Sequence, residues 1–224
     1  APLTVEGGLI TGRLEDLQGR FNLNNLINSQ GEEDQVSRST FERLLLSLEL
    51  DPGIAGVATD WLDVDGEASF PRGAEDAAYS GTAPPYRVPN SMITSPSELM
   101  AMFGLEQEDY LKLAPYVTAL PIGTKLNVNT ASDYVLASLS DDIDLPAAGS
   151  LIQEQRGASG FINVIATFER LVEPDLLSRI DRVSQHFLLA ATVSIGTTQI
   201  TMYSLLQRDD SGIVRSVFRS LGVE

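Results

Sequence analysis

The sequence contains no cysteine and only one histidine, His186. The absence of cysteine excludes disulfide bonds, thiolate catalysis and any zinc or iron–sulfur site that depends on sulfur ligands. It is compatible with a bacterial periplasm, and cysteine-free cytosolic proteins are also ordinary. No run of about 18 apolar residues occurs, so these residues offer no segment that would cross a membrane as a helix.

The sequence also lacks an initiator methionine and the pattern of a signal peptide, because it begins with Ala1-Pro2-Leu3. We therefore expect a mature or trimmed fragment, whose missing N-terminal segment carries targeting or anchoring information. Internal repeats at a fixed period and low-complexity stretches are likewise missing.

Basic residues are scarce. The chain has 15 of them against 31 acidic residues, for a net charge of −16. A surface this negative repels phosphate backbones and anionic lipids, and it suits a divalent cation or a basic partner. With 43% hydrophobic and 21% charged residues, the composition is that of a folded protein with a substantial core.

The middle of the chain has the pattern of a small helical domain. An apolar stripe at i, i+3, i+4 and i+7 predicts a helix over residues 39–50, built on Phe41, Leu44, Leu45 and Leu48. Ser95-Pro96-Ser97-Glu98 has the form of a capping box and starts a second helix that ends at Gly104. Thr130 with Asp133 is a further capping pair. Short helices are also predicted over 107–114, 131–139, 146–156, 163–171 and 175–181.

The C-terminal part is rich in β-formers. Three strands are predicted over 187–195, 199–207 and 213–218, and the links between them are short turn sequences. Strands joined so closely form an antiparallel meander, whose edges need cover from the N-terminal segment and a helix. Residues 8–25 fit either a strand or the end of a helix followed by a strand. The sequence therefore predicts an α+β fold with a helical insertion.

Acidic residues are densest around Asp60, Asp63 and Asp65, with Glu75 and Asp76 shortly after. We expect these carboxylates in a loop too rich in glycine and proline to continue as a helix. Crowded carboxylates raise one another's pKa unless a cation neutralises them, and calcium takes six to eight oxygen ligands. The spacing does not match an EF-hand. The alternative is a solvated acidic loop without metal, and Trp61 is expected in the core.

Catalysis finds little support. A carboxylate-based glycosidase needs two carboxyl groups across a cleft, at a separation that the sequence does not give. His186 precedes a predicted strand, where a surface or core position is the ordinary one. The G-x-S-x-G elbow, the P-loop and the G-x-G-x-x-G fingerprint are all missing.

Residues 125–168 resemble a helix-hairpin-helix segment. Nucleic-acid-binding hairpins present glycine, lysine and backbone amides to phosphate. Here the connection between the helices reads Ser140-Asp141-Asp142-Ile143-Asp144. Three aspartates at this place disfavour DNA binding, even where the architecture is shared.

The order of the motifs along the chain resembles the K-class minor pseudopilins of bacterial type II secretion systems. The resemblance spans nearly the whole chain. It is carried by GRFNLNNL at 19–26, DWLDVD at 60–65, GAED at 73–76 with Tyr79, PYRVPN at 85–90, EL at 98–99, LP at 120–121 and LNVNTA at 126–131.

The resemblance implies a pilin-like antiparallel sheet domain at residues 1–30 and 183–224. Residues 31–182 would form a large inserted all-helical domain of sterile-alpha-motif or helix-hairpin-helix type. It also implies calcium, with ligands drawn from Asp60, Asp63, Asp65, Glu75 and Asp76.

The implied role is structural: a part at the tip of the periplasmic pseudopilus, not an enzyme. The implied partners are the minor pseudopilins of the I, J and H classes, with the major pseudopilin as a further candidate and no nucleic acid. The full-length protein would be anchored in the inner membrane by a hydrophobic N-terminal helix. The alternatives are a helix-hairpin-helix module that binds nucleic acid or protein, and a carboxylate-based hydrolase.

Overall fold

The computed structural model describes residues 2–5 and 7–222, which form two compact units. The sheet unit comprises Ala1–Gln18 and Val183–Glu224, and the helical unit comprises Gly19–Arg182. The fold is α+β, with the helical unit inserted into the sheet unit. The first boundary falls earlier than the expected 30/31, because Phe21, Leu23 and Leu26 are buried in the core of the helical unit.

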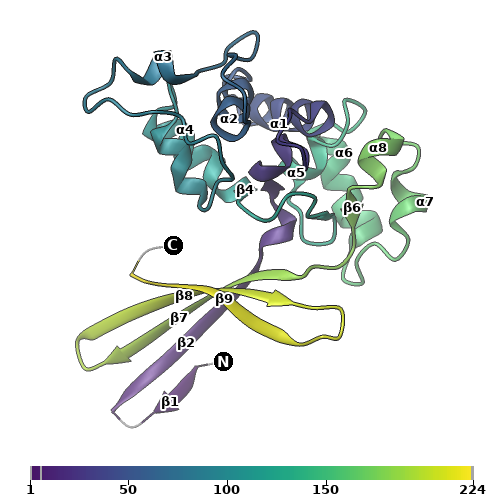
Figure 1. Ribbon diagram of the computed structural model, residues 1–224. Helices are drawn as coiled ribbons and strands as arrows, with labels where there is room; N and C mark the ends of the chain where they lie inside the picture. The colour runs from purple at the N-terminus through teal and green to yellow at the C-terminus, as the bar shows by residue number, and fades with distance from the viewer. Residues whose placement is uncertain (1, 6, 223–224) are drawn as a thin grey trace. The chain divides into compact units, whose positions relative to one another are not determined.

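The sheet unit is a five-stranded antiparallel sheet in the order β1-β2-β7-β8-β9 (Figure 1). The C-terminal meander is confirmed, and the ambiguous N-terminal segment contributes β2, which pairs with β7 from Gly8↔Ile195 to Asp16↔Phe187. In the described part of this unit, no helix of more than three residues covers an edge of the sheet. β9 is an edge strand, with a neighbouring strand on one side. The strands are β1 Leu3–Val5, β2 Gly8–Asp16, β7 His186–Ile195, β8 Thr198–Arg208 and β9 Val214–Leu221.

One face of this sheet is apolar. Alternate side chains of a strand point to the same face, and the register places Ile10, Val193 and Ile200 in one row across three strands. Two rows further along the same face, Leu14 lies opposite Leu189. Leu14 and Ile200 are exposed. The face therefore remains uncovered within the described part of the sheet unit.

The helical unit consists of short helices with a common core. Its α-helices are α1 Gln35–Ser47, α2 Ile54–Leu62, α3 Asp76–Tyr79, α4 Gln107–Leu113, α5 Asp133–Ala137, α6 Leu145–Ser150, α7 Val164–Phe168 and α8 Pro174–Leu177. A π-helical turn, Leu151–Arg156, continues α6. The 3-10 turns of this unit are Leu23–Leu26, Pro96–Ala101 and Ala114–Tyr116, and a further turn, Leu17–Gly19, spans the boundary between the two units. Two short parallel pairs join β3 Phe21–Asn22 to β4 Val117–Thr118, and β5 Leu126–Asn127 to β6 Ile180–Asp181.

Helix α1 is the centre of that core. It begins earlier than predicted, at Gln35, because Asp34 accepts a hydrogen bond from the Ser37 amide and caps it. Of the predicted apolar stripe, Phe41, Leu44 and Leu45 are buried and Leu48 is partly buried. Phe41 stacks on Phe21 with ring centroids 4.9 Å apart. The capping box at Ser95 and Glu98 is confirmed, although it opens a 3-10 turn.

Three local predictions were wrong. Ser132, not Thr130, caps α5 by accepting from the Val135 amide. The last predicted helix ends at Leu177, since Ile180 and Asp181 pair with β5. Residues before Asp63 form α2, where a loop was expected around the acidic cluster. Every residue of α2 is buried, so it shows no polar face that would reveal a helical period.

Candidate metal site

Asp60 lies near the end of α2 and is completely buried. Its carboxylate accepts hydrogen bonds from two backbone amides of the following loop, Ser69 at 3.1 Å and Ala74 at 2.7 Å. A carboxylate with two amide donors is well satisfied as an anion. Asp60 therefore ties the loop over residues 64–74 back onto the helix from which it departs.

Three of the five predicted ligands converge. Asp63, Asp65 and Glu75 each offer a carboxylate oxygen, and these oxygens all lie within 4.8 Å of one another. Asp63 is 4% exposed and is the C-terminal cap residue of α2. Asp65 is exposed on the loop, and Glu75 lies immediately before α3 and is half-buried. Segments before and after the loop thus bring the three carboxylates together.

This arrangement is electrostatically unfavourable by itself. Burial raises the pKa of Asp63 to about 7, and the neighbouring carboxylates of Asp65, Asp60 and Glu75 add to the rise. The pKa of Glu75 is raised by burial and then by Asp60 and Asp65. The pKa of Asp60 is also raised, because its burial outweighs the donors around it. A cation among these groups would remove the repulsion.

Three buried oxygens in the described part of the chain have no hydrogen-bond partner: Asp63 Oδ1, Glu75 Oε1 and Asn90 Oδ1. Asn90 belongs to the same place, because its amide nitrogen donates to the backbone carbonyl of Asp65 at 3.1 Å. A buried oxygen without a donor is costly unless an ion or water completes it. Carboxylate, amide and carbonyl oxygens are the ligands that calcium takes in proteins.

Asn90 was not among the ligands predicted from the sequence. It stands at the end of the PYRVPN motif and adopts a positive φ of 45°, which asparagine tolerates better than most residues. The signal in the sequence that could have indicated such a ligand is an asparagine that follows a proline in a segment without regular structure. Its distance in sequence from the acidic cluster concealed its contact with Asp65.

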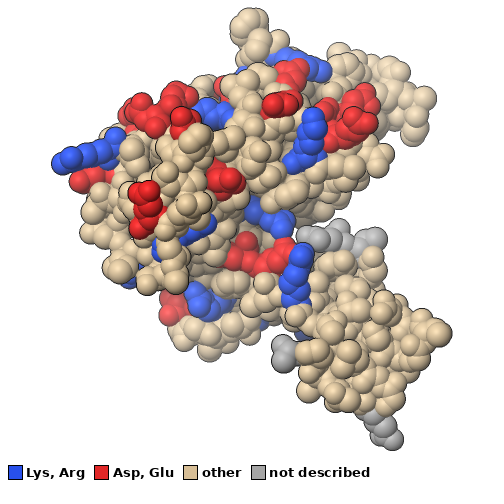
Figure 2. All heavy atoms as spheres, turned by 180° about the vertical axis from the view of Figure 1, so that it is seen from behind, with Lys and Arg blue, Asp and Glu red and all other residues tan. Residues whose placement is uncertain are grey.

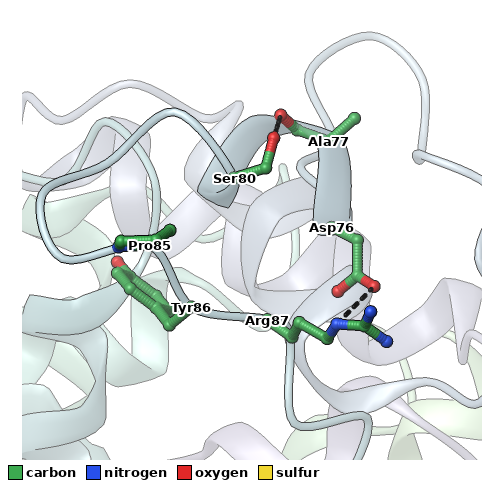
Figure 3. A pocket seen from close by; sticks show the side chains of 6 residues that line it. All are labelled: Asp76, Ala77, Ser80, Pro85, Tyr86 and Arg87. Atoms are coloured by element: carbon green, nitrogen blue, oxygen red, sulfur yellow. Dashed lines mark hydrogen bonds and ion pairs between the residues drawn. The ribbon is translucent and has the colours of Figure 1, made fainter.

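Asp76 is directed elsewhere, although it follows Glu75. One of its oxygens accepts from the Val88 amide at 3.2 Å, and the other faces Arg87 Nε at 3.8 Å. Asp76 lines a pocket with Tyr86 and Arg87 (Figure 3). Among the predicted ligands, the carboxylates of Asp60 and Asp76 therefore accept hydrogen bonds from backbone amides and do not belong to the group of three.

Trp61 is buried as expected, and its indole N–H donates to Glu98 at 3.3 Å. His186 is buried in the sheet unit, where desolvation lowers its pKa. Two aspartates of the hairpin connection have partners: Asp144 caps α6 and Asp141 faces Arg43 at 3.9 Å. This connection stays acidic in the folded protein.

Two family models match the chain, both described as type II secretion system protein K, over residues 19–122 and 126–180. A relative from Pseudomonas aeruginosa, type II secretion system protein K, is 37% identical over 97% of this chain and 66% of its own length. The Klebsiella pneumoniae protein of the same name is 31% identical over 92% of this chain and 68% of its own length. The chain belongs to the type II secretion system protein K family.

The fold agrees with membership of the protein K family. A chain in the crystal structure of the GspK-GspI-GspJ complex from enterotoxigenic Escherichia coli superposes with a TM-score of 0.84 at 23% identity. The match covers 100% of this chain and 83% of that one. The family models and the relatives confirm the resemblance stated from the motifs, and the superposition confirms the α+β fold with its inserted helical unit. This chain spans about two thirds of the length of the Pseudomonas aeruginosa and Klebsiella pneumoniae relatives.

Proposed function

We propose that the chain is the periplasmic part of a structural minor pseudopilin at the tip of the type II secretion pseudopilus. Membership of the protein K family carries the proposal: the family models match residues 19–122 and 126–180, and the Pseudomonas aeruginosa relative matches 97% of the chain. The alternative of a helix-hairpin-helix module that binds nucleic acid is not favoured, since the hairpin connection is acidic. The role needs no catalysis: the protein would work by docking to sister subunits.

The partners that we propose are the minor pseudopilins of the I, J and H classes, with the major pseudopilin as a further candidate. The likeness to a chain from a GspK-GspI-GspJ complex supports the first two. Mixing this chain with purified I and J partners should give a complex that elutes earlier than each component on size exclusion. Separate elution of all three proteins at micromolar concentrations would contradict the proposal.

We also propose an inner-membrane anchor for the full-length protein, as the family resemblance implies. No helix among the described residues has the length and hydropathy needed to cross a bilayer. The uncovered apolar sheet face, with Ile10, Leu14, Val193 and Ile200, suits the packing of an amphipathic helix. Full-length protein should partition with inner membranes while this domain is digested by protease from the periplasmic side.

The converging carboxylates form, in this proposal, a calcium site. Asp63, Asp65 and Glu75 would supply oxygens, the Asn90 amide oxygen would join them, and Asp60 would hold the loop in place. The ion would neutralise the repulsion that raises the pKa of Asp63, and would so order the loop between α2 and α3.

Isothermal titration of chelator-treated protein with calcium tests this site. We expect saturable binding to the wild type, no comparable binding of magnesium because it demands a small octahedral cage, and loss of binding in Asp63→Ala with Asp65→Ala. The matched control is Asp141→Ala with Asp142→Ala, which removes two exposed aspartates of the hairpin connection. Equal calcium binding by both double variants would refute the assignment.

A further inference from the structure

The pocket beside α3 is separate from the three converging carboxylates. It has a volume of about 420 Å³ and is lined by Asp76, Ala77, Ser80, Pro85, Tyr86 and Arg87. Figure 3 shows Arg87 between Asp76, which lies on α3, and the ring of Tyr86. Tyr86 and Arg87 belong to the chain segment that follows α3 and folds back along it. The pocket thus combines one carboxylate, one aromatic ring and small side chains.

The Asp76 carboxylate has unused acceptor capacity. Among the residues that the structure describes, the Val88 amide alone donates to it within hydrogen-bond distance. Arg87 Nε stands 3.8 Å from the second oxygen, and the Arg87 side chain is 86% exposed. An exposed pair at this separation contributes little free energy, so Arg87 holds the position weakly.

Tyr86, by contrast, is rigidly placed. Its ring packs on Tyr79 with centroids 5.1 Å apart, and its hydroxyl donates to the Ala101 carbonyl at 2.5 Å. Tyr79 is itself fully buried, and its hydroxyl accepts from the Phe103 amide. The partly exposed Tyr86 ring therefore offers a fixed aromatic surface, and an aromatic face attracts a cation.

The electrostatic field of the helical unit favours a cation as well. Residues 19–182 contain 25 acidic and 11 basic residues, for a net charge of −14. Acidic groups spread over the helical unit in Figure 2, where the face of the sheet unit is largely uncharged. A field of this sign raises the local concentration of basic ligands at any cleft of the unit.

We propose that this pocket binds an arginine side chain of a partner protein, with the guanidinium between the Asp76 carboxylate and the Tyr86 ring. The guanidinium is planar, pairs with carboxylates through two parallel N–H groups and stacks on aromatic faces, so it matches both walls better than an ammonium group. The incoming arginine displaces Arg87 from Asp76. The pocket is a recognition point in the inserted helical unit and does not depend on the identity of the bound metal.

Two-dimensional amide NMR of the calcium-treated protein tests the proposal, with N-acetyl-arginine methylamide as the probe and its citrulline analogue as the neutral isostere. We expect saturable shifts at the amides of Ala77, Ser80 and Tyr86, with affinity on the order of millimolar for one side chain. The citrulline analogue should give none, and higher salt should weaken the response.

Three variants separate this proposal from its rivals. Asp76→Asn and Tyr86→Leu should each weaken binding of the arginine probe by about tenfold. Tyr86 does not belong to the group of three carboxylates. Arg87→Gln should strengthen it by about twofold to threefold, because the internal competitor is gone. Shifts shared by the citrulline analogue, or weaker binding in Arg87→Gln, would overturn the proposal. Calcium titration of each variant reports separately on the metal site.

Discussion

Asp63 is the residue at which burial and charge conflict most sharply. It is 4% exposed and one of its oxygens has no donor, and burial, with the neighbouring carboxylates of Asp65, Asp60 and Glu75, raises its pKa to about 7. Asp60 is more deeply buried, but its carboxylate accepts hydrogen bonds from two backbone amides. The difference lies in the backbone: the loop over 64–74 returns its amides to Asp60 and leaves Asp63 facing Asp65 and Glu75.

The calcium-free protein should show this conflict as a pH dependence. Because the folded pKa of Asp63 lies above its unfolded value, the folded state binds the extra proton and is stabilised at low pH. That stability is lost as the pH rises toward about 7. In chelator, the melting temperature of the wild type should fall between about pH 5 and about pH 8. Asp63→Asn, which carries no charge, should show a flatter profile, and an unchanged slope would contradict the argument.

Calcium should reverse the order of the two proteins. At neutral pH in chelator, Asp63→Asn should be at least as stable as the wild type, because an unfavourable buried charge is gone. With free calcium at about a hundred times its Kd, the wild type should gain about 2.7 kcal/mol and the variant far less. Thermal melts with and without calcium measure both effects. A variant that gains as much as the wild type would place the ion elsewhere.

At the scale of elements, α1 is secured at its first turn by a residue with two functions. Asp34 caps the helix through the Ser37 amide and pairs with Arg179 at 2.7 Å, which ties α1 to the end of the helical unit's chain. Burial opposes the charged form of Asp34, but the bonds from Arg179 and Ser37 together lower its pKa. The start of α1 therefore depends on a residue far along the sequence.

Replacing Asp34 by alanine should destabilise the protein by about 1–2 kcal/mol at neutral pH, since a cap and a partly buried ion pair are lost together. The lowered pKa means that this stability is present above the ordinary aspartate pKa and disappears as the pH falls through the folded value. Asp144→Ala, which removes the exposed cap of α6, is the control and should cost less. Urea denaturation at neutral and acid pH measures the difference.

The sheet has a second consequence at this scale. Leu14 and Ile200 are exposed on its apolar face, so Leu14→Gln with Ile200→Gln should change the stability of this chain by less than about 0.5 kcal/mol per site. Leu188→Gln, buried on the opposite face, should destabilise it by several times more. In the full-length protein, the double variant Leu14→Gln with Ile200→Gln should assemble less well with the I and J partners. Normal assembly would show that this face carries no contact.

At the scale of the whole molecule, the apolar core is unevenly divided. The contiguous buried cluster runs from Phe21 to Ile180 and lies entirely within the helical unit. The described strands of the sheet unit bury few side chains, among them His186 at 6% and Leu188 at 9% exposure. The inserted unit is therefore the part that has its own core, although the sheet unit supplies both ends of the chain.

A fragment of residues 19–182 should fold by itself. We expect cooperative melting within a few degrees of the corresponding transition of the longer chain, and unchanged calcium affinity, because the core and all proposed ligands are retained. Circular dichroism and calcium titration of the fragment test this. The same fragment with Asp63→Asn is the control for specific binding. A fragment without a cooperative transition would show that its core needs the sheet unit.

Local chemistry made much of this protein predictable from its sequence. The capping box at Ser95, the apolar stripe of α1 and the three C-terminal strands all follow from patterns that neighbouring residues complete among themselves. The order of motifs indicated the protein K family and, through it, the inserted helical unit. The sequence also located the acidic cluster, because its carboxylates are concentrated in two short stretches of the chain, at 60–65 and 75–76.

Tertiary structure decided which of those carboxylates meet. Helix α2 escaped prediction because it is buried on all sides, and its position turns Asp60 inward while Asp63 faces Glu75. Asn90 joins them from a distant segment, and Asp76, next to Glu75, takes the opposite direction into the pocket. Spacing along a chain fixes how far apart residues can lie, whereas packing of the core fixes where each side chain points.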